Sequence, residues 1–282
     1  MNIIANFAVL ASRRMILDVP VCDFDWEEAL QSVYALALRP GGQTVISFVN
    51  AHNLLVQQRD ARYREILYRN LVLPDGIGLD IASCIAHGSA FPANLNGTDF
   101  VPALLTYMDR PMRIGLIGGT PTVVERAAEN FRAHAPWHTF IAVSDGYLDG
   151  ERSAAVAEET LRHDLDILIV GMGTPLQEKW VAAHIGPQHA RLVLTVGALF
   201  DFVSEAVPRA PKLVRALRLE WAFRLLQEPR RLWRRYLIGI PLFLHQIARH
   251  RLRRRRDTLR PVGAAVRIPL IGERSVRPAD RR

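Results

Sequence analysis

Short apolar runs alternate with amphipathic segments through roughly the first 200 residues of the chain. The apolar runs are rich in Val, Ile and Leu and carry few polar positions, as is typical of strands that are buried on both faces of a parallel sheet. The segments between them have the length and apolar spacing of helices. The alternation therefore predicts an α/β fold with a Rossmann-like, mostly parallel sheet and helices on both of its faces.

The pattern also places the individual elements. We expect strands at 14–20, 44–49, 71–73, 113–119, 139–144, 166–173 and 191–197. We expect helices at 25–38, 50–70, 100–109, 121–134, 151–163 and from 175 onward, with Asp23 or Asp25 capping the first of them.

Polar loops follow the predicted strands. They collect Asn, Asp, Gly, Thr and Gln, and they span residues 48–53, 74–78, 118–121, 171–178 and 197–201. Ligands of open parallel sheets bind outside the carboxyl ends of the strands. We therefore expect the functional site among these loops.

Two of these loops are glycine turns at strand-to-helix junctions, one with Gly118 and Gly119 and one with Gly171 and Gly173. Glycine lets a ligand approach the backbone, and a helix amino terminus favours a phosphate. A tight turn needs glycine in any case, so each turn alone is equally well explained by structure. Two in one sheet favour a nucleotide diphosphate, although neither a G-x-G-x-x-G fingerprint nor a P-loop is present.

Asp75 follows a predicted strand in the string Leu73-Pro74-Asp75-Gly76. A carboxylate there is a candidate general base for deprotonating a hydroxyl nucleophile, but Asp is also a favoured helix cap, and the local sequence alone favours the cap. Asn50 and Asn53 are interpreted either as turn formers or as substrate donors. His52 is expected to be packed or on the surface, and Asp99 to cap the helix at 100–109.

The sequence shows little metal or disulfide chemistry. Cys22 and Cys84 lie far apart and make neither a disulfide framework nor a metal site, which fits a reducing compartment. The D-x-D string of Asp23 and Asp25 occurs as a metal motif in many sugar transferases, but helix capping explains it here. Without metal ligands, a leaving diphosphate would have to be stabilised by backbone amides or arginines.

The charge is segregated. Residues 209–256 hold fourteen Arg, one Lys and two acids, a net charge of +13 in a chain of net +8. The arginines are interleaved with aromatic residues and an apolar run at 236–247, which is too short to span a bilayer. A membrane surface or a lipid-linked phosphate suits this segment, with a nucleic-acid arm as the alternative.

The composition defines three parts: a catalytic domain at 1–206, a basic helical, membrane-associating appendage at 207–256 and a tail at 257–282 that we expect to be disordered. A nicotinamide dehydrogenase fits the sheet pattern but lacks the glycine fingerprint. The sequence leaves open whether the protein is a homo-oligomer.

Several strings resemble, in order and spacing, the WecG/TagA/CpsF glycosyltransferase family. They are Val72-Leu73-Pro74-Asp75-Gly76-Ile77-Gly78, Asn96-Gly97-Thr98-Asp99, Gly118-Gly119, residues 171–178, 196–202, 209–211, 219–225, 228–231 and 234–236. The resemblance covers about residues 14–247 and is specific as a set, although each string is weak alone.

The resemblance implies an inverting, metal-independent transferase without a cofactor. Its donor would be a UDP-sugar, a hexose or N-acetylhexosamine, and its acceptor a polyprenyl-diphosphate-linked glycan. Its place would be the cytoplasmic side of the bacterial membrane, peripherally bound, in exopolysaccharide or related surface-polymer synthesis. No nucleic-acid partner is expected. By the same resemblance Asp75 is the catalytic base, and the substrate-binding residues are Asn50, Asn53, Asp99, Gly118, Gly119, Gly171, Gly173, Gln177, Arg224, Arg231 and Arg234.

Two positions depart from the family pattern. Phe48 stands where many members carry Thr, and Asn94 stands where many carry Arg. Both departures favour a sugar or acceptor other than the N-acetylmannosamine system. The three arginines at 224, 231 and 234 would share one helical face, with a kink at Pro229.

Overall fold

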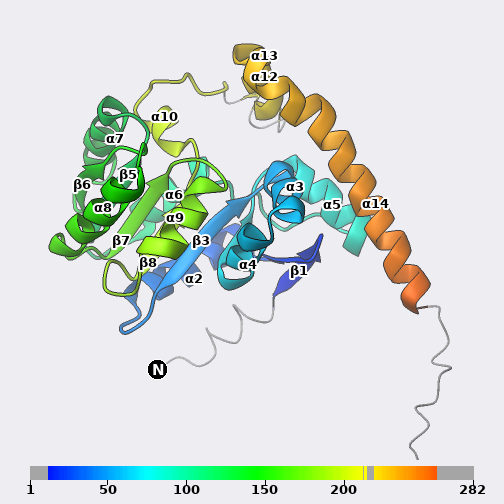
Figure 1. The fold of residues 1–282 in the computed structure, drawn as a ribbon, viewed down its shortest axis with the longest axis horizontal. Helices are drawn as coiled ribbons and strands as arrows, with labels where there is room; N and C mark the ends of the chain where they lie inside the picture. The colour runs from blue at the N-terminus through cyan, green and yellow to red at the C-terminus, as the bar shows by residue number, and fades with distance from the viewer. Residues whose placement is uncertain (1–11, 212, 215–218, 259–282) are drawn as a thin grey trace, which may run out of the picture.

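The structure is a computed structural model that describes residues 12–211, 213–214 and 219–258 (Figure 1). Its centre is an eight-stranded sheet in the order β1-β2-β4-β3-β8-β7-β5-β6. β1 and β2 form an antiparallel hairpin at one edge, and the other neighbouring strands are parallel. The predicted α/β class with a mostly parallel sheet is confirmed. The predicted tail lies outside the described residues from 259 onward.

The strands lie close to their predicted positions. They are β1 (Arg13–Ile16), β2 (Val19–Cys22), β3 (Thr44–Val49), β4 (Leu71–Pro74), β5 (Arg113–Gly118), β6 (Thr139–Ser144), β7 (Ile167–Gly171) and β8 (Leu192–Thr195). The single strand predicted at 14–20 is instead a hairpin. In its turn Leu17 and Asp18 adopt the left-handed conformation, at φ values of 46° and 67°. The pattern of apolar residues does not predict such a turn.

Helices cover both faces of the sheet. The first face carries α2 (Trp26–Leu38), α6 (Gly97–Tyr107), α7 (Pro121–His134) and α10 (Leu199–Val203). The second face carries α3 (Ala51–Arg59), α4 (Ala61–Arg69), α5 (Ile77–His87), α8 (Gly150–Arg162) and α9 (Leu176–His184). Successive residues of β3 enter different cores, Phe48 under the first face and Val49 under the second, as strand geometry requires.

The single helix predicted at 50–70 is two helices, and Asp60 is the reason. Its backbone is extended, its carboxylate accepts the N–H of Tyr63 to cap α4, and it also pairs with Lys179 of α9. A side chain that caps a new helix and binds a neighbouring one competes with helical continuation at this residue.

The C-terminal helices run across the carboxyl edge of the sheet and down one side of the core (Figure 1). They are α12 (Glu220–Gln227), α13 (Pro229–Trp233), the π-helical turn η1 (Arg234–Ile238) and α14 (Gly239–Thr258). The chain breaks between α12 and α13 at Pro229, which confirms the predicted kink.

The long helix α14 is docked on α3 and α5. Phe243 is 0% exposed and Ile247 is 2% exposed, and both belong to the core formed with those helices. Part of the apolar run that we expected on a membrane is therefore buried inside the protein. Within the described residues, no helix is both long enough and apolar enough to cross a bilayer.

Candidate active site

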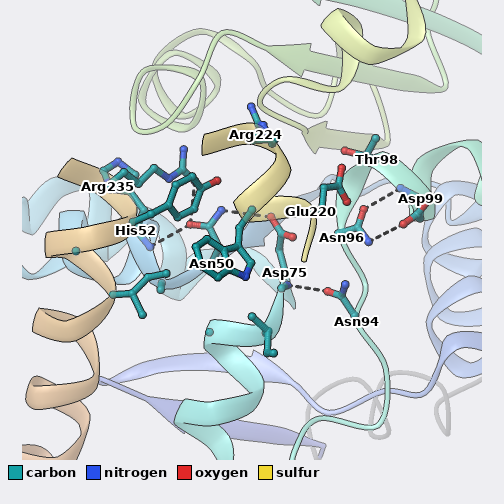
Figure 2. Close-up of a pocket in the computed structure, with 18 of the residues that line it drawn as sticks. Asn50, His52, Asp75, Asn94, Asn96, Thr98, Asp99, Glu220, Arg224 and Arg235 are labelled. Carbon is teal, nitrogen blue, oxygen red and sulfur yellow. Dashed lines mark hydrogen bonds between the residues drawn. The ribbon is translucent and has the colours of Figure 1, made fainter. Parts of the chain in front are cut away.

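A cavity of about 190 Å³ lies at the carboxyl ends of β3 and β4 (Figure 2). Its floor comes from the loops that follow these strands and from the start of α6, and its roof comes from α12, η1 and the start of α14. The lining residues are Asn50, Ala51, His52, Asp75, Gly76, Ile77, Gly78, Asn94, Asn96, Thr98, Asp99, Phe202, Glu220, Trp221, Arg224, Arg235, Tyr236, Gly239 and Ile240. The site thus combines the core with the appendage.

Strand register brings Asp75 and Asn50 together. Val49 of β3 pairs with Pro74 of β4, so the two residues that follow these strands are neighbours. The Asp75 backbone N–H donates to the Val49 carbonyl at 2.9 Å, and the Asn50 Nδ2 donates to the Asp75 carboxylate at 3.3 Å. Asp75 therefore presents a carboxylate to the cavity, with one oxygen held by an amide (Figure 2).

Asp75 does not cap the helix that follows it. Gly76 is the N-cap of α5, at φ 87°, and α5 has no side-chain cap. The capping interpretation of Asp75, which the local sequence favoured, is wrong. Instead Asn94 braces this loop, because its Oδ1 accepts the Gly76 N–H at 2.7 Å.

Burial raises the pKa of the Asp75 carboxyl above its usual value. The hydrogen bond from Asn50 and the charges of Arg235 and Arg224 oppose this shift, while the nearby Asp99 carboxylate adds to it. A carboxylate with a raised pKa is a stronger base toward a hydroxyl group. The cavity thus gives Asp75 the electrostatic setting of a general base.

Two arginines of the appendage face this carboxylate from the roof (Figure 2). The Arg224 guanidinium lies 5.2 Å from the centre of the Phe202 ring, which holds it from the side. Arg235 donates from Nη2 to the Asn50 Oδ1 at 3.3 Å. Burial, and secondarily the charge of Arg235, lowers the pKa of His52 to about 4, so this imidazole is neutral at neutral pH.

A second group of charges ties the appendage to the core. Arg209 donates to the Asp99 carboxylate at 2.5 Å, and its Nε lies 3.9 Å from the Glu220 carboxylate. Burial raises the pKa of Glu220, against the opposing charges of Arg209 and Arg224. Asp99 does not begin its helix: Asn96 caps α6 by accepting the Asp99 N–H at 2.9 Å.

Asn50 and Asn53 both prove to be structural at the amino end of α3. They form a reciprocal capping box in which each side chain accepts the backbone N–H of the other. Asn50 also lines the cavity. Asn53 is 3% exposed and lies beneath it, donating to Tyr63 and Thr174.

The glycine turns lie outside the lining of this cavity. A Cβ at Gly118 would stand 2.3 Å from the Gly171 carbonyl oxygen, so close packing of the two turns accounts for this glycine. Gly173, at φ 82°, borders open space. Gln177 is buried and its Oε1 accepts the N–H groups of Gly173 and Gly197, at 3.2 and 3.0 Å, so it joins two of the loops.

The arginines of the appendage that line the cavity are not the set predicted to share one helical face. Arg224 lines the cavity as expected. Arg234 is exposed and lies 5.3 Å from the centre of the Trp233 ring, whereas its neighbour Arg235 lines the cavity. The side chain of Arg231 lies outside the described part of the structure.

Asn94 lines the cavity, as its place in the family pattern implied. Sequence reasoning missed several other cavity residues, namely Arg235, Glu220, Trp221, Tyr236, Asn96, Thr98 and His52. The pair of arginines before Tyr236 could have pointed to Arg235, but regular α-helical spacing from Arg224 places Arg234, and not Arg235, on the predicted face.

The two aspartates of the D-x-D string have structural roles. Asp25 caps α2 in a capping box with Glu28, and Asp23 pairs with Arg14 at 2.8 Å. In the part of the chain that the structure describes, no three His, Cys, Asp or Glu side chains are grouped so as to hold a metal ion.

Comparison with known proteins identifies the family of the chain. Residues 14–257 match the Glycosyl transferase WecG/TagA/CpsF family. Three of the relatives are named N-acetylglucosaminyldiphosphoundecaprenol N-acetyl-beta-D-mannosaminyltransferase. Those of Bacillus spizizenii and Bacillus subtilis are 30% and 31% identical, over 68% and 71% of this chain and 74% and 77% of their own. That of Staphylococcus aureus is 34% identical over 49% of this chain and 52% of its own. The chain therefore belongs to the WecG/TagA/CpsF family and is a glycosyltransferase.

Proposed function

We propose that the protein transfers a hexose or N-acetylhexosamine from a UDP donor to a sugar linked to polyprenyl diphosphate, with inversion and without a metal ion. The observation that carries the proposal is a single arrangement. Asp75, a half-buried carboxylate of raised pKa, lies beneath two arginines that belong to a different part of the chain. A base opposite a pair of cations fits a reaction in which a hydroxyl attacks and a diphosphate leaves.

In this mechanism Asp75 removes the proton from the acceptor hydroxyl. The hydroxyl oxygen forms a bond to the anomeric carbon on the face opposite UDP. The bond from that carbon to the diphosphate oxygen breaks, and its electron pair stays on UDP. The sugar is inverted, and the proton remains on Asp75 until it is lost to solvent.

Arg224 and Arg235 would bind the leaving diphosphate. Each guanidinium offers several donors in a planar fork that matches phosphate oxygens. Because both arginines line a partly enclosed cavity, their charges are less screened there than on an open surface. This pair takes the part that a metal ion plays in other sugar transferases.

The relatives support the acceptor class, since their names specify an undecaprenol-linked diphosphate sugar. We propose the same class of acceptor here and leave the donor sugar to experiment. Asn94, which stands where many members carry Arg, braces the loop of Asp75 and lines the cavity. An amide in place of a guanidinium changes the charge beside the bound sugar, which favours a donor other than UDP-N-acetylmannosamine.

We also propose that the enzyme works while peripherally bound to the cytoplasmic membrane. Around the roof, four large apolar side chains remain solvent-exposed: Leu226 at 82%, Leu237 at 60%, Ile238 at 53% and Trp233 at 41%. Exposed arginines, Arg230 and Arg234, accompany them. A mixed cationic and apolar surface binds anionic lipid, and it would place the roof next to a lipid-linked acceptor.

The test is a donor screen. The purified protein is given a panel of UDP-hexoses and UDP-N-acetylhexosamines with a short-chain polyprenyl-diphosphate sugar, and UDP release is measured. We expect one donor to be turned over and Asp75→Asn to reduce that rate by at least about 10³-fold while the thermal unfolding temperature stays within a few degrees.

Two results would refute the proposal. Near-normal turnover by Asp75→Asn would remove the base assignment. Release of no nucleotide from any donor, together with salt-sensitive binding to nucleic acid, would favour the nucleic-acid alternative instead.

A further inference from the structure

A line of hydrogen bonds runs from Asp75 away from the cavity into the second core. Asn50 Nδ2 donates to Asp75 at 3.3 Å, and the Asn50 backbone N–H donates to the Asn53 Oδ1 at 3.3 Å. Asn53 Nδ2 donates to the Thr174 hydroxyl at 2.9 Å, and that hydroxyl donates to the Glu178 carboxylate at 3.0 Å. The line therefore joins α3 to the β7–α9 loop and to the first turn of α9.

The bonds between Glu178 and the Asn53 side chain have a fixed direction. The Thr174 hydroxyl donates its one proton to Glu178 and accepts from Asn53 with a lone pair. Because Thr174 and Tyr63 both receive the Asn53 amide nitrogen, the Asn53 oxygen must face the Asn50 N–H. An ionised carboxylate accepts and never donates, so above its pKa Glu178 fixes the direction of the bonds as far as the Asn53 side chain.

At the cavity the Asn50 amide has a single orientation, which its own contacts set. Its oxygen receives the N–H groups of His52 and Asn53 and a donor from Arg235. Its nitrogen is left for Asp75. If the Asn50 amide turned over, its oxygen would oppose the Asp75 carboxylate and its nitrogen would oppose Arg235, and both contacts would become repulsive.

The inner end of the line is otherwise hard to explain. Glu178 is 1% exposed, and its second carboxylate oxygen has no hydrogen-bond partner among the described residues. Burying a carboxylate in this way opposes folding. Glu178 lies outside the cavity lining, so it has no direct part in binding a substrate there. A buried charged group that opposes folding and lies outside this cavity points to a role through its neighbours.

We propose that Glu178, Thr174 and Asn53 are positioning residues for the transfer reaction: they hold the Asn50 amide toward Asp75 and thereby tune the base. The inference rests on the proposed role of Asp75. Loss of the line frees the Asn53 side chain from the Asn50 backbone N–H, so Asn50 is held less firmly at the amino end of α3. Its hydrogen bond to Asp75, which lowers the pKa of that carboxyl, is then weakened. The expected signature is a change in the pH dependence of catalysis rather than in substrate affinity.

The central variant is Thr174→Val, which keeps the shape of the side chain and removes both hydrogen bonds. We expect kcat to fall by about tenfold, the effect of losing one hydrogen bond to a charged group, because the poorer positioning of the Asp75 carboxylate outweighs its gain in basicity. KM for the donor should be unchanged. We also expect the acid limb of the kcat profile to move to higher pH, because the Asp75 pKa rises. Thr174→Ser restores the hydroxyl and should recover most of the lost activity and the position of the limb.

Thr160→Val is the matched control. Thr160 is a buried threonine of α8 whose hydroxyl bonds, among the described residues, only to the Val156 carbonyl within its own helix. It should lower the thermal unfolding temperature and leave the acid limb in place. Glu178→Gln is the second variant, should Thr174→Val fold poorly: its amide can present either a donor or an acceptor to Thr174, and it should shift the limb in the same direction.

The outcomes separate the two proposals. If Asp75→Asn is inactive and the acid limb of both Thr174→Val and Glu178→Gln coincides with that of the unmodified enzyme, the positioning role is refuted and the base assignment stands. If Asp75→Asn remains active, the base assignment fails and the positioning role fails with it. A shifted limb in Thr174→Val and Glu178→Gln, absent in Thr160→Val, supports both.

Discussion

The raised pKa of the buried Glu178 leads to a quantitative prediction about the free energy of unfolding. Burial raises its pKa from the usual 4.5 to about 7, against hydrogen bonds from Gln177 and Thr174 that lower it. The folded protein therefore holds this proton more tightly than the unfolded chain does. Stability from the group is fully present below pH 4.5 and is lost as the pH rises through 7.

The size of the effect follows from the shift. Each unit of pKa difference corresponds to about 1.4 kcal/mol, so ionising Glu178 in the folded state opposes folding by roughly 3 kcal/mol at pH 8 and by about 1 kcal/mol at pH 5. Glu178→Gln resembles the protonated acid at every pH. The unfolding free energy of the variant should exceed that of the unmodified protein by an amount that grows by about 2 kcal/mol between pH 5 and pH 8.

Urea unfolding followed by circular dichroism at both pH values measures this difference. Glu129→Gln is the control, because Glu129 is an exposed glutamate on α7, and it should keep the pH dependence of the unmodified protein. A constant difference between Glu178→Gln and the unmodified protein from pH 5 to pH 8 would refute the reasoning. The same variant should be more stable and yet less active at pH 8, which a purely structural role for Glu178 does not produce.

Two further predictions concern the roof of the cavity. Arg235→Ala should lower kcat by about 10²-fold or more, as expected for a charge-assisted contact to a leaving group. Arg234→Ala should lower kcat less than about threefold with a water-soluble acceptor, and equal losses from the two variants would contradict the assignment of Arg235 to the cavity. Phe243→Ala should reduce the unfolding free energy by roughly 3–5 kcal/mol, the usual result of removing a buried Phe, and should release α14 to proteolysis; resistance equal to that of the unmodified protein would contradict the docking of α14 through this residue.

The sheet and most helices were predictable because each repeats a local pattern. The strand at 44–49 and the helix at 121–134 have the same bounds in the structure. The helix break at Asp60 was predictable only in part: its capping of α4 is local, but its pairing with Lys179 joins residues distant in sequence.

The site was predictable only in outline. Asp75 and Asn50 could each be proposed from their loops, but their contact depends on the register of β3 against β4. Whether Asp75 caps α5 is decided by Gly76, whose conformation delays the start of the helix. The choice of Arg235 over Arg234 follows from the π-helical turn η1, which displaces the side chains from regular α-helical spacing.

The docked roof determines when, during synthesis of the chain, the Asp75 carboxylate acquires its raised pKa. Asp75 belongs to the first third of the chain, but the groups that exclude water from it and set its charge environment come from the last quarter. Removing the roof would leave the carboxylate in place, hydrated and ordinary in its acidity. If Asp75 is the base, its chemical strength is conferred by residues synthesised long after it, and a chain whose final helices have not yet docked holds this carboxylate in an unactivated state.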